Sequence, residues 1–107
     1  MSVLLVHCTC PDAESAERIA RALVDERLAA CVSRLEGLRS TYRWEGRVQT
    51  DTEVLLLAKT CADRLDALTA RVLELHPHEL PELVAVEAHA GHAPYLHWVA
   101  QQTRLDD

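Results

Sequence analysis

The spacing of apolar and polar side chains predicts that the chain opens with a strand and a helix. Residues 2–10 form a nearly unbroken apolar and β-branched run, which is typical of a central strand buried on both faces. Asp12 then stands where a helix N-cap is expected, and the following residues place apolar side chains on one helical face. Glu17 and Arg21 are spaced to pair on the opposite side. We expect this helix to end near Leu28.

A long β-hairpin follows, with strands predicted at 31–44 and 47–60. The alternation of the first strand changes phase at residues 36–37, which is the expected mark of a β-bulge. The two-residue turn at 45–46 ends in glycine, where a positive φ is needed. The return strand is polar at first and becomes solidly apolar over 54–58. Only the inner half of this strand is therefore buried by its own domain.

The remaining pattern predicts a helix, a strand and a short closing helix. Thr60 and Asp63 resemble a capping box at the start of the first of these helices. Its apolar stripe consists of Leu65, Leu68, Val72 and Leu75. Pro77 ends it, and residues 82–89 have the composition of a strand. The positions of the closing helix that we expect to face inward are Tyr95, Trp98 and Val99.

The resulting order is β-α-β-β-α-β-α, in which a hairpin joins two β-α-β halves. This order predicts an α+β fold, a ferredoxin-like βαββαβ sandwich with a long hairpin between the second and third strands and a short C-terminal helix. The chain has 107 residues, close to the most common domain size. We therefore expect residues 1–107 to form a single domain.

The charge balance and the lengths of the apolar runs argue against two classes of partner. Seventeen acidic and eleven basic residues give a formal net charge of −6, and Lys59 is the only lysine. Binding to a phosphate backbone depends on a basic face, so nucleic acid is not an expected partner. No apolar run approaches the roughly 18 residues of a membrane helix, so we expect no membrane partner either.

The cysteines and the start of the chain favour a reducing compartment. The four cysteines are Cys8, Cys10, Cys31 and Cys61. On one strand the α-carbons of Cys8 and Cys10 would lie about 7 Å apart, which is awkward for a disulfide. Met1 leads directly into the apolar run, without the basic segment or cleavage site of a secretory leader. We therefore expect a cytoplasmic protein with free thiols.

The outer half of the hairpin predicts an oligomer. Each arm extends about seven residues beyond the buried part, or roughly 20 Å at ~3.3 Å per residue. An isolated two-stranded ribbon is only marginally stable in water. Tyr42 and Trp44, near the tip, stabilise most when they are buried. The ribbon could curl over its own sheet, but we expect it to pair with a neighbouring subunit.

Several segments of the sequence together resemble a known family. They are Glu26-Arg27-Leu28-Ala29-Ala30-Cys31-Val32, Gly37 with Ser40-Thr41-Tyr42-Arg43-Trp44-Glu45-Gly46, Val54-Leu55-Leu56-Leu57-Ala58-Lys59-Thr60, Leu75-His76-Pro77 with Pro81-Glu82, and Tyr95-Leu96 with Trp98. In order and spacing they resemble the CutA divalent-cation tolerance family over essentially the whole chain. The resemblance implies a homotrimer similar in architecture to the nitrogen-regulatory PII proteins, with hairpins that cross between subunits. It also implies metal tolerance and metal binding, without an established catalytic reaction.

The resemblance further implies a site for copper or another divalent cation. Cys8 matches a copper-ligand position of some members, and His76 matches a ligand histidine. The chain departs from the family pattern in having Leu75 where some members have a second histidine, and His78 where tyrosine is usual. The ligand set is therefore complete only if His78 or Cys10 takes part.

The residues themselves allow both metal-binding and structural interpretations. Cys8 and Cys10 alternate onto one strand face, where two sulfurs could reach one soft ion, or both could be small buried hydrophobes. His76 and His78 bracket a proline in extended chain and would project to one side, either as two ligands or as solvated loop histidines. His89 and His92 flank Gly91 and could add a surface site, although exposed histidines bind metals adventitiously.

Two other classes of function compete with metal binding. A PII-like signalling trimer would bind a small anionic ligand in clefts between subunits, although three glycines leave no phosphate-binding loop. An enzyme would use Cys8 as a nucleophile and His76 as its base, but the sequence shows no oxyanion-hole motif and no third group to orient the base. We therefore expect a metal-binding protein that is not an enzyme.

Overall fold

The computed structural model describes residues 2–104 and confirms the predicted order of strands and helices. In chain order the elements are β1 (Val3–Cys10), α1 (Ala13–Asp25), β2 (Cys31–Trp44), β3 (Arg47–Cys61), α2 (Leu65–Leu75), β4 (Leu83–Glu87) and α3 (Ala93–Gln102). Among the described residues, no helix combines the length and the apolar character needed to cross a bilayer.

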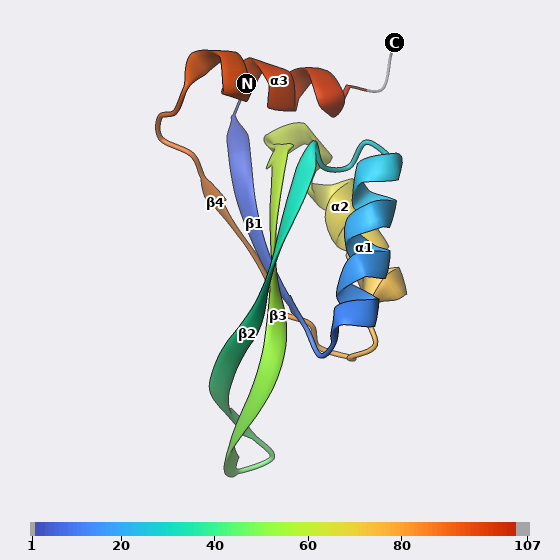
Figure 1. The fold of residues 1–107 in the computed structure, drawn as a ribbon, viewed down its shortest axis with the longest axis vertical. Coiled ribbons are helices and arrows are strands. Elements are labelled where there is room, and N and C mark those ends of the chain that lie inside the picture. The colour runs from blue at the N-terminus through green and yellow to red at the C-terminus, as the bar shows by residue number, and fades with distance from the viewer. Residues whose placement is uncertain (1, 105–107) are drawn as a thin grey trace.

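The four strands form one antiparallel sheet in the order β2-β3-β1-β4. β1 is therefore central, as its apolar run predicts, and Cys8 lies opposite Leu56 of β3 and Leu83 of β4. Helices α1 and α2 cover one face of the sheet, and alternate strand residues pack against them (Figure 1). The most buried members of this core include Val6, Ile19, Leu56, Leu68 and Val72.

Helix α1 begins as predicted and ends earlier than expected. Asp12 caps it, because the Asp12 Oδ1 atom accepts a hydrogen bond from the Ser15 amide at 2.8 Å. The helix ends at Asp25 rather than near Leu28, because Arg27 adopts a left-handed backbone with φ of 59°. A left-handed residue commonly closes a helix in this way, although glycine is the usual choice there.

The predicted capping box at the start of α2 is wrong. Thr60 is fully buried near the end of β3, and its hydroxyl donates to the Leu28 carbonyl oxygen at 2.7 Å. A short 3-10 helix, Ala62–Arg64, precedes α2, which begins at Leu65 without a side-chain capping bond. Thr60 points into the core because it continues the inward alternation of β3. Its hydroxyl therefore ties the strand to the end of the α1 segment.

The hairpin has the predicted bulge and turn. Its register shifts between Leu35 and Leu38, and Glu45 and Gly46 have φ values of 50° and 78°, as a type I′ turn requires. The outer half projects from the body of the molecule, which measures 46 Å along its longest axis (Figure 1). Residues 41–52 are all exposed within one chain, so the ribbon does not curl over its own sheet.

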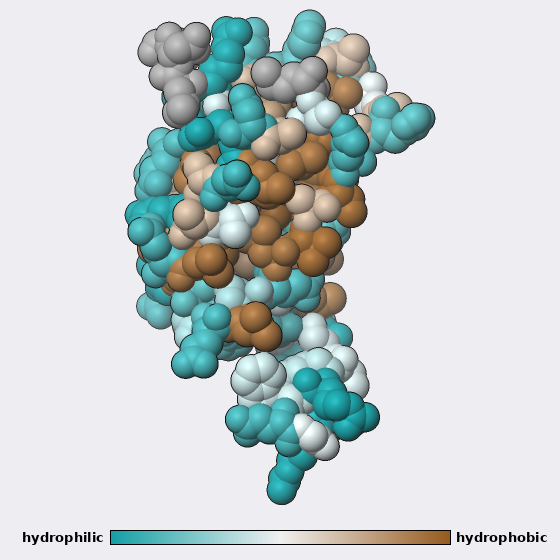
Figure 2. Space-filling view, turned by 180° about the vertical axis from the view of Figure 1, so that it is seen from behind, coloured by the Kyte–Doolittle hydropathy of each residue, from teal (hydrophilic) through white to brown (hydrophobic). Residues whose placement is uncertain are grey.

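Apolar side chains are also exposed on the body of the protein. Val84 and Val86 of β4 are about half exposed. The space-filling view shows apolar side chains gathered over the body, above the projecting hairpin (Figure 2). An exposed apolar surface of this kind commonly marks an interaction site.

Helix α3 crosses the end of the sheet that lies opposite the hairpin tip (Figure 1). Val99 is fully buried, as predicted, but Tyr95 and Trp98 are 40% and 39% exposed, so the expectation that both face inward is wrong. The inward stripe instead contains Leu96, Val99 and Ala100, which have the i, i+3, i+4 spacing of one helical face. Tyr95 and Trp98 lie beside that stripe, with ring centroids 5.6 Å apart.

Candidate metal centre

Two cysteines and a histidine from distant parts of the chain meet at the end of β1. Cys8 and Cys10 are two residues apart on this strand, so both face the helical layer. His76 directly follows α2, where its extended backbone (φ −75°, ψ 136°) and Pro77 end the helix. Candidate ligand atoms of the three residues all lie within 4.8 Å of one another. Their exposed fractions are 4%, 0% and 7%, so the cluster is buried.

Both ring nitrogens of His76 are engaged in hydrogen bonds. Nε2 lies 2.7 Å from the Thr9 carbonyl oxygen, and Nδ1 accepts a bond from the His78 amide at 3.1 Å. A carbonyl can only accept and an amide can only donate, so the ring carries its proton on Nε2. A metal must therefore displace the His78 amide from Nδ1 or replace the proton on Nε2. Metal binding through His76 therefore competes either with the turn that follows α2 or with the bond to the Thr9 carbonyl.

The pKa values of the two thiols in the cluster are shifted in opposite directions. Hydrogen bonding to Cys10, followed by burial, raises the pKa of Cys8 well above that of an ordinary thiol. The hydrogen bond from Cys8 lowers the pKa of Cys10, and a hydrogen bond from Ser15 acts in the same direction, while burial opposes both. Of the two thiols, Cys10 is therefore the one that gives up its proton first, while Cys8 retains its own.

Carboxylates near the cluster favour a cation. Glu82 and Glu53 raise the pKa of Cys8 through their charge, and Asp12 and Glu53 act in the same direction on Cys10. Negative charge that opposes a thiolate stabilises a positive ion placed at the same position. The electrostatic surroundings are thus suited to a metal ion that replaces the thiol protons.

The donor set fits a soft metal ion. Sulfur and imidazole nitrogen are typical ligands of copper and zinc. With bonds of about 2.3 Å to sulfur and about 2.0 Å to nitrogen, two ligand atoms on one ion lie at most about 4.6 Å apart. Ligand atoms that already lie within 4.8 Å of one another need only a small closing movement. Because every buried side-chain nitrogen and oxygen in residues 2–104 has a hydrogen-bond partner, an ion must compete with existing bonds.

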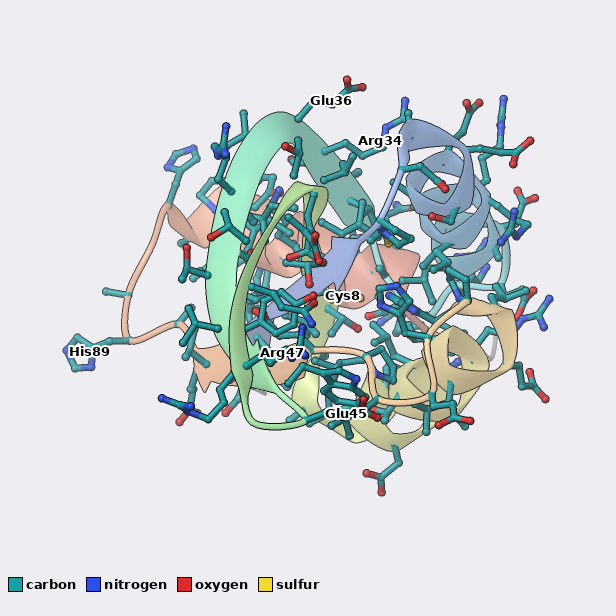
Figure 3. The ribbon with its side chains drawn as sticks, turned by 90° about the horizontal axis from the view of Figure 1, so that it is seen from below. Cys8, Arg34, Glu36, Glu45, Arg47 and His89 are labelled. Atoms are coloured by element: carbon teal, nitrogen blue, oxygen red, sulfur yellow. The ribbon has the colours of Figure 1, made fainter. Side chains whose placement is uncertain are left out.

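The structure separates the histidines that the sequence left as alternatives. His78 is exposed, and its ring centroid lies 5.1 Å from that of the buried His76. The interpretation of both as solvated loop histidines is therefore wrong for His76, whose buried ring accepts the His78 amide. Cys10 joins Cys8 and His76 in place of His78. His89 projects outward from the segment before α3, far from Cys8 (Figure 3).

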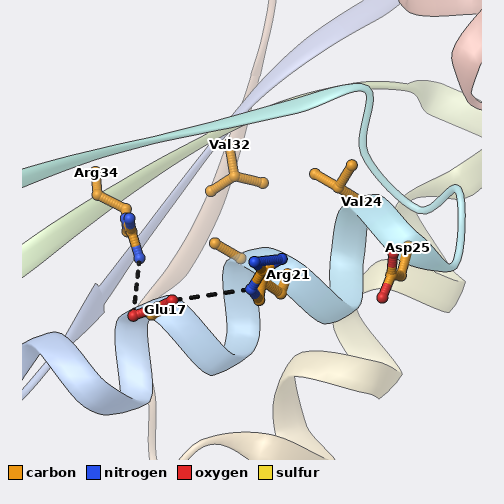
Figure 4. Close-up of a pocket in the computed structure, with 7 residues that line it drawn as sticks. Glu17, Arg21, Val24, Asp25, Val32 and Arg34 are labelled. Carbon is orange, nitrogen blue, oxygen red and sulfur yellow. Dashed lines mark ion pairs between the residues drawn. The ribbon is translucent and has the colours of Figure 1, made fainter.

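A separate hollow of about 330 Å³ lies between α1 and β2, away from the cysteine cluster (Figure 4). Its lining includes the apolar Val24 and Val32, with charged side chains around them. Arg21 and Arg34 each lie 3.8 Å from Glu17, which confirms the predicted Glu17–Arg21 pair. Their charges are thus partly neutralised by Glu17, and the hollow lies within one chain, whereas the alternative small-ligand site was predicted between subunits.

Sequence reasoning did not find the main-chain groups that orient His76. The Thr9 carbonyl and the His78 amide belong to the backbone, which carries no residue-type signal. The contact between Lys59 and Ser33, at 2.6 Å across neighbouring strands, was also missed. The strand register could have indicated this second contact, since the two residues lie in adjacent rows on one face of β2 and β3.

Comparison with known proteins places the whole fold in one family. The model of the CutA1 divalent ion tolerance protein family matches residues 4–102. The divalent-cation tolerance protein CutA of Thermus thermophilus is 48% identical over 99 residues, which cover 92% of this chain and 96% of that protein. Protein CutA of Mus musculus is 44% identical over 102 residues, which cover 95% of this chain and 58% of the mouse protein. The chain spans somewhat more than half the length of its mouse, human and rice relatives.

Solved structures agree with the sequence comparison. The crystal structure of CutA from Xylella fastidiosa matches with a TM-score of 0.95 and 47% identity, covering 97% of this chain and all of that one. The divalent cation tolerance protein of Thermus thermophilus matches with a TM-score of 0.93 and 46% identity, covering 95% of this chain and 99% of that one. The family model, the relatives and the solved structures together show that the chain belongs to the CutA1 divalent ion tolerance family.

Proposed function

We propose that this protein binds copper, or another divalent cation, through Cys8, Cys10 and His76 and acts in tolerance to metal ions. The observation that carries the proposal is the buried cluster of two thiols and an imidazole, with candidate ligand atoms within 4.8 Å of one another. Family membership supports it, because the Thermus relative is named as a divalent-cation tolerance protein. Two sulfur ligands favour the soft end of the metal series, so copper is the preferred ion.

Buried coordination suits storage of an ion better than catalysis on it. A catalytic metal keeps an open coordination position for water or substrate. All three candidate ligands are less than a tenth exposed, and Cys10 is completely buried. We therefore propose that the protein is not an enzyme. The four free cysteines support a cytoplasmic location, where thiols remain reduced.

We further propose that residues 1–107 form a single domain that assembles as a homotrimer similar to the PII proteins. Support comes from the outer hairpin, where Trp44 is 44% and Val48 is 65% exposed within one chain. Burying these side chains against a neighbouring copy would stabilise the assembly, and Trp44, as the larger side chain, would contribute more than Val48. Light scattering on the eluting protein tests this proposal, and a mass of one 12.0 kDa chain at micromolar concentration would contradict it.

The metal site is tested by competition with a chromophoric chelator under anaerobic conditions. Wild type is compared with Cys8→Ser, Cys10→Ser and His76→Gln, using Cu(I), Cu(II) and Zn(II) in parallel. Cys61→Ser is the matched control, since Cys61 is also a fully buried free cysteine but lies outside the cluster. Wild type and the control should bind one ion per chain. The metal affinity of each cluster variant should fall by more than the roughly 10–100-fold that follows loss of a residue hydrogen-bonded to a ligand.

Two results would remove the proposed site. The first is a wild-type protein that takes no ion from the chelator. The second is binding that survives unchanged in all three cluster variants, which would place the metal elsewhere on the chain. A loss in Cys61→Ser equal to that in Cys8→Ser would also count against it, because the effect would then reflect a disturbed core rather than lost ligands.

A further inference from the structure

The only lysine of the chain faces its only partly exposed cysteine. Cys31 of β2 and Lys59 of β3 are register partners in the sheet, and the Lys59 Nζ atom lies 3.9 Å from the Cys31 Sγ atom. The other three cysteines are at most 4% exposed, whereas Cys31 is of intermediate exposure. One accessible thiol and the one side-chain amine of the protein are thus held side by side.

Two further groups hold this pair in place. Lys59 donates to the Ser33 hydroxyl at 2.6 Å, which fixes the ammonium group over β2. Tyr95 of α3 lies beside Cys31, and burial, followed by the proximity of Cys31, raises the pKa of Tyr95. The sulfur therefore accepts from the amine and has the phenol as a neighbour. Cys31 and Tyr95 lie at the α3 end of the sheet, away from the projecting hairpin (Figure 1).

We propose that Cys31 and Lys59 form a redox-dependent covalent cross-link when the protein meets a hydroperoxide. In the first step the Cys31 thiolate attacks the peroxide O–O bond, so that sulfur is oxidised to sulfenic acid. The alkoxide or hydroxide released takes a proton from the Lys59 ammonium group and leaves as an alcohol or water, which makes the amine neutral. In the second step the neutral amine of Lys59 attacks that sulfur. An S–N bond forms, the S–O bond breaks, and the hydroxyl leaves as water with a proton from the amine.

The geometry allows the second step without movement of the backbone. Side chains directly opposite one another on antiparallel strands have β-carbons about 4.5–5.5 Å apart. The Lys59 amine is already at 3.9 Å on a flexible stem with four carbons, so rotation about side-chain bonds closes the remaining distance. The product ties β2 to β3, removes the positive charge of Lys59 and consumes the one accessible thiol. A thiol reductant restores both groups, because it attacks the S–N sulfur.

Intact-mass spectrometry of the whole protein after treatment with one equivalent of hydrogen peroxide tests the cross-link. The expected product has lost two hydrogens, and a tryptic digest should join the Cys31 and Lys59 peptides and lack cleavage after Lys59. Dithiothreitol should reverse both changes. Lys59→Arg keeps the charge but not the nucleophilic amine, so this variant and Cys31→Ser should yield none of the product. Cys61→Ser is the control and should yield as much as wild type.

Two outcomes would overturn the inference. One is accumulation of sulfinic acid at Cys31 in wild type at the same rate as in Lys59→Arg, which would show that the amine does not capture the sulfenic acid. The other is loss of two hydrogens in Lys59→Arg as well, which would identify the product as a disulfide. Neither outcome depends on the metal site at Cys8 and His76, so the proposed function is tested separately.

Discussion

Replacing His76 by alanine is expected to destabilise the metal-free protein, quite apart from any loss of metal. The buried ring donates to the Thr9 carbonyl at 2.7 Å and accepts the His78 amide at 3.1 Å. Alanine removes both partners at once and leaves a space where the ring stood. The free energy of unfolding should therefore fall even when no ion is present.

The expected size of this effect follows from the groups left without partners. A buried main-chain acceptor that loses its bond costs about 1–3 kcal/mol. The His78 amide is near the surface and can form a hydrogen bond to water instead, so we assign little free-energy cost to the loss of its bond. The lost packing of a buried ring adds about 1 kcal/mol or more. Together these give about 2–4 kcal/mol for His76→Ala.

Urea unfolding in the presence of a chelator measures this loss, at a fixed protomer concentration because assembly also contributes to stability. His76→Gln should recover part of it, since its amide can donate to the Thr9 carbonyl in place of Nε2. His78→Ala, at an exposed position, is the matched control and should stay within about 0.5 kcal/mol of wild type. A metal-free His76→Ala protein as stable as wild type would refute the reasoning, because the ring would then serve metal binding alone.

Three further predictions concern other bonds in the structure. Thr60→Val removes the buried hydroxyl that donates to the Leu28 carbonyl at 2.7 Å, and it should lower the free energy of unfolding by about 1–3 kcal/mol in urea. Asp12→Ala should lower the thermal midpoint at neutral pH. Because the Ser15 amide holds the pKa of Asp12 below its usual value, this difference should vanish as the pH falls through the folded pKa. Copper affinity should rise from about pH 6 to about pH 8, since the pKa of Cys8 is raised and coordination releases its proton; equal affinities at the two pH values in chelator competition would show that no thiol proton is released.

The sequence was sufficient for the order of the elements because local periodicity carries that information. The unbroken apolar run of β1 indicated a central strand, and the phase change near residue 36 located the bulge. Asp12 indicated the start of α1, since a capping side chain accepts hydrogen bonds from amides only a few residues away. The turn at Glu45 likewise depends on the conformations of two adjacent residues. Each of these features is fixed by neighbours in the chain.

The errors arose where a distant segment decided the outcome. Thr60 is a residue type that often caps helices, yet its hydroxyl donates a hydrogen bond to the Leu28 carbonyl, which lies 32 positions away in the chain. Tyr95 and Trp98 are apolar enough for a core, but the end of the sheet accepts only one face of α3. Helical spacing alone does not reveal which side of a short helix meets the sheet.

The metal cluster shows the same division between local pattern and tertiary contact. Strand alternation alone determined that Cys8 and Cys10 share a face, and family resemblance pointed to His76. Only the tertiary structure decided that Cys10 completes the group, because the His76 ring, which follows α2, reaches the end of β1 and bonds to the Thr9 carbonyl there. Hydrogen bonds from Thr9 and His78 then fix the ring. The sequence specifies which residues could be ligands, but the distances between their segments depend on how the helices pack on the sheet.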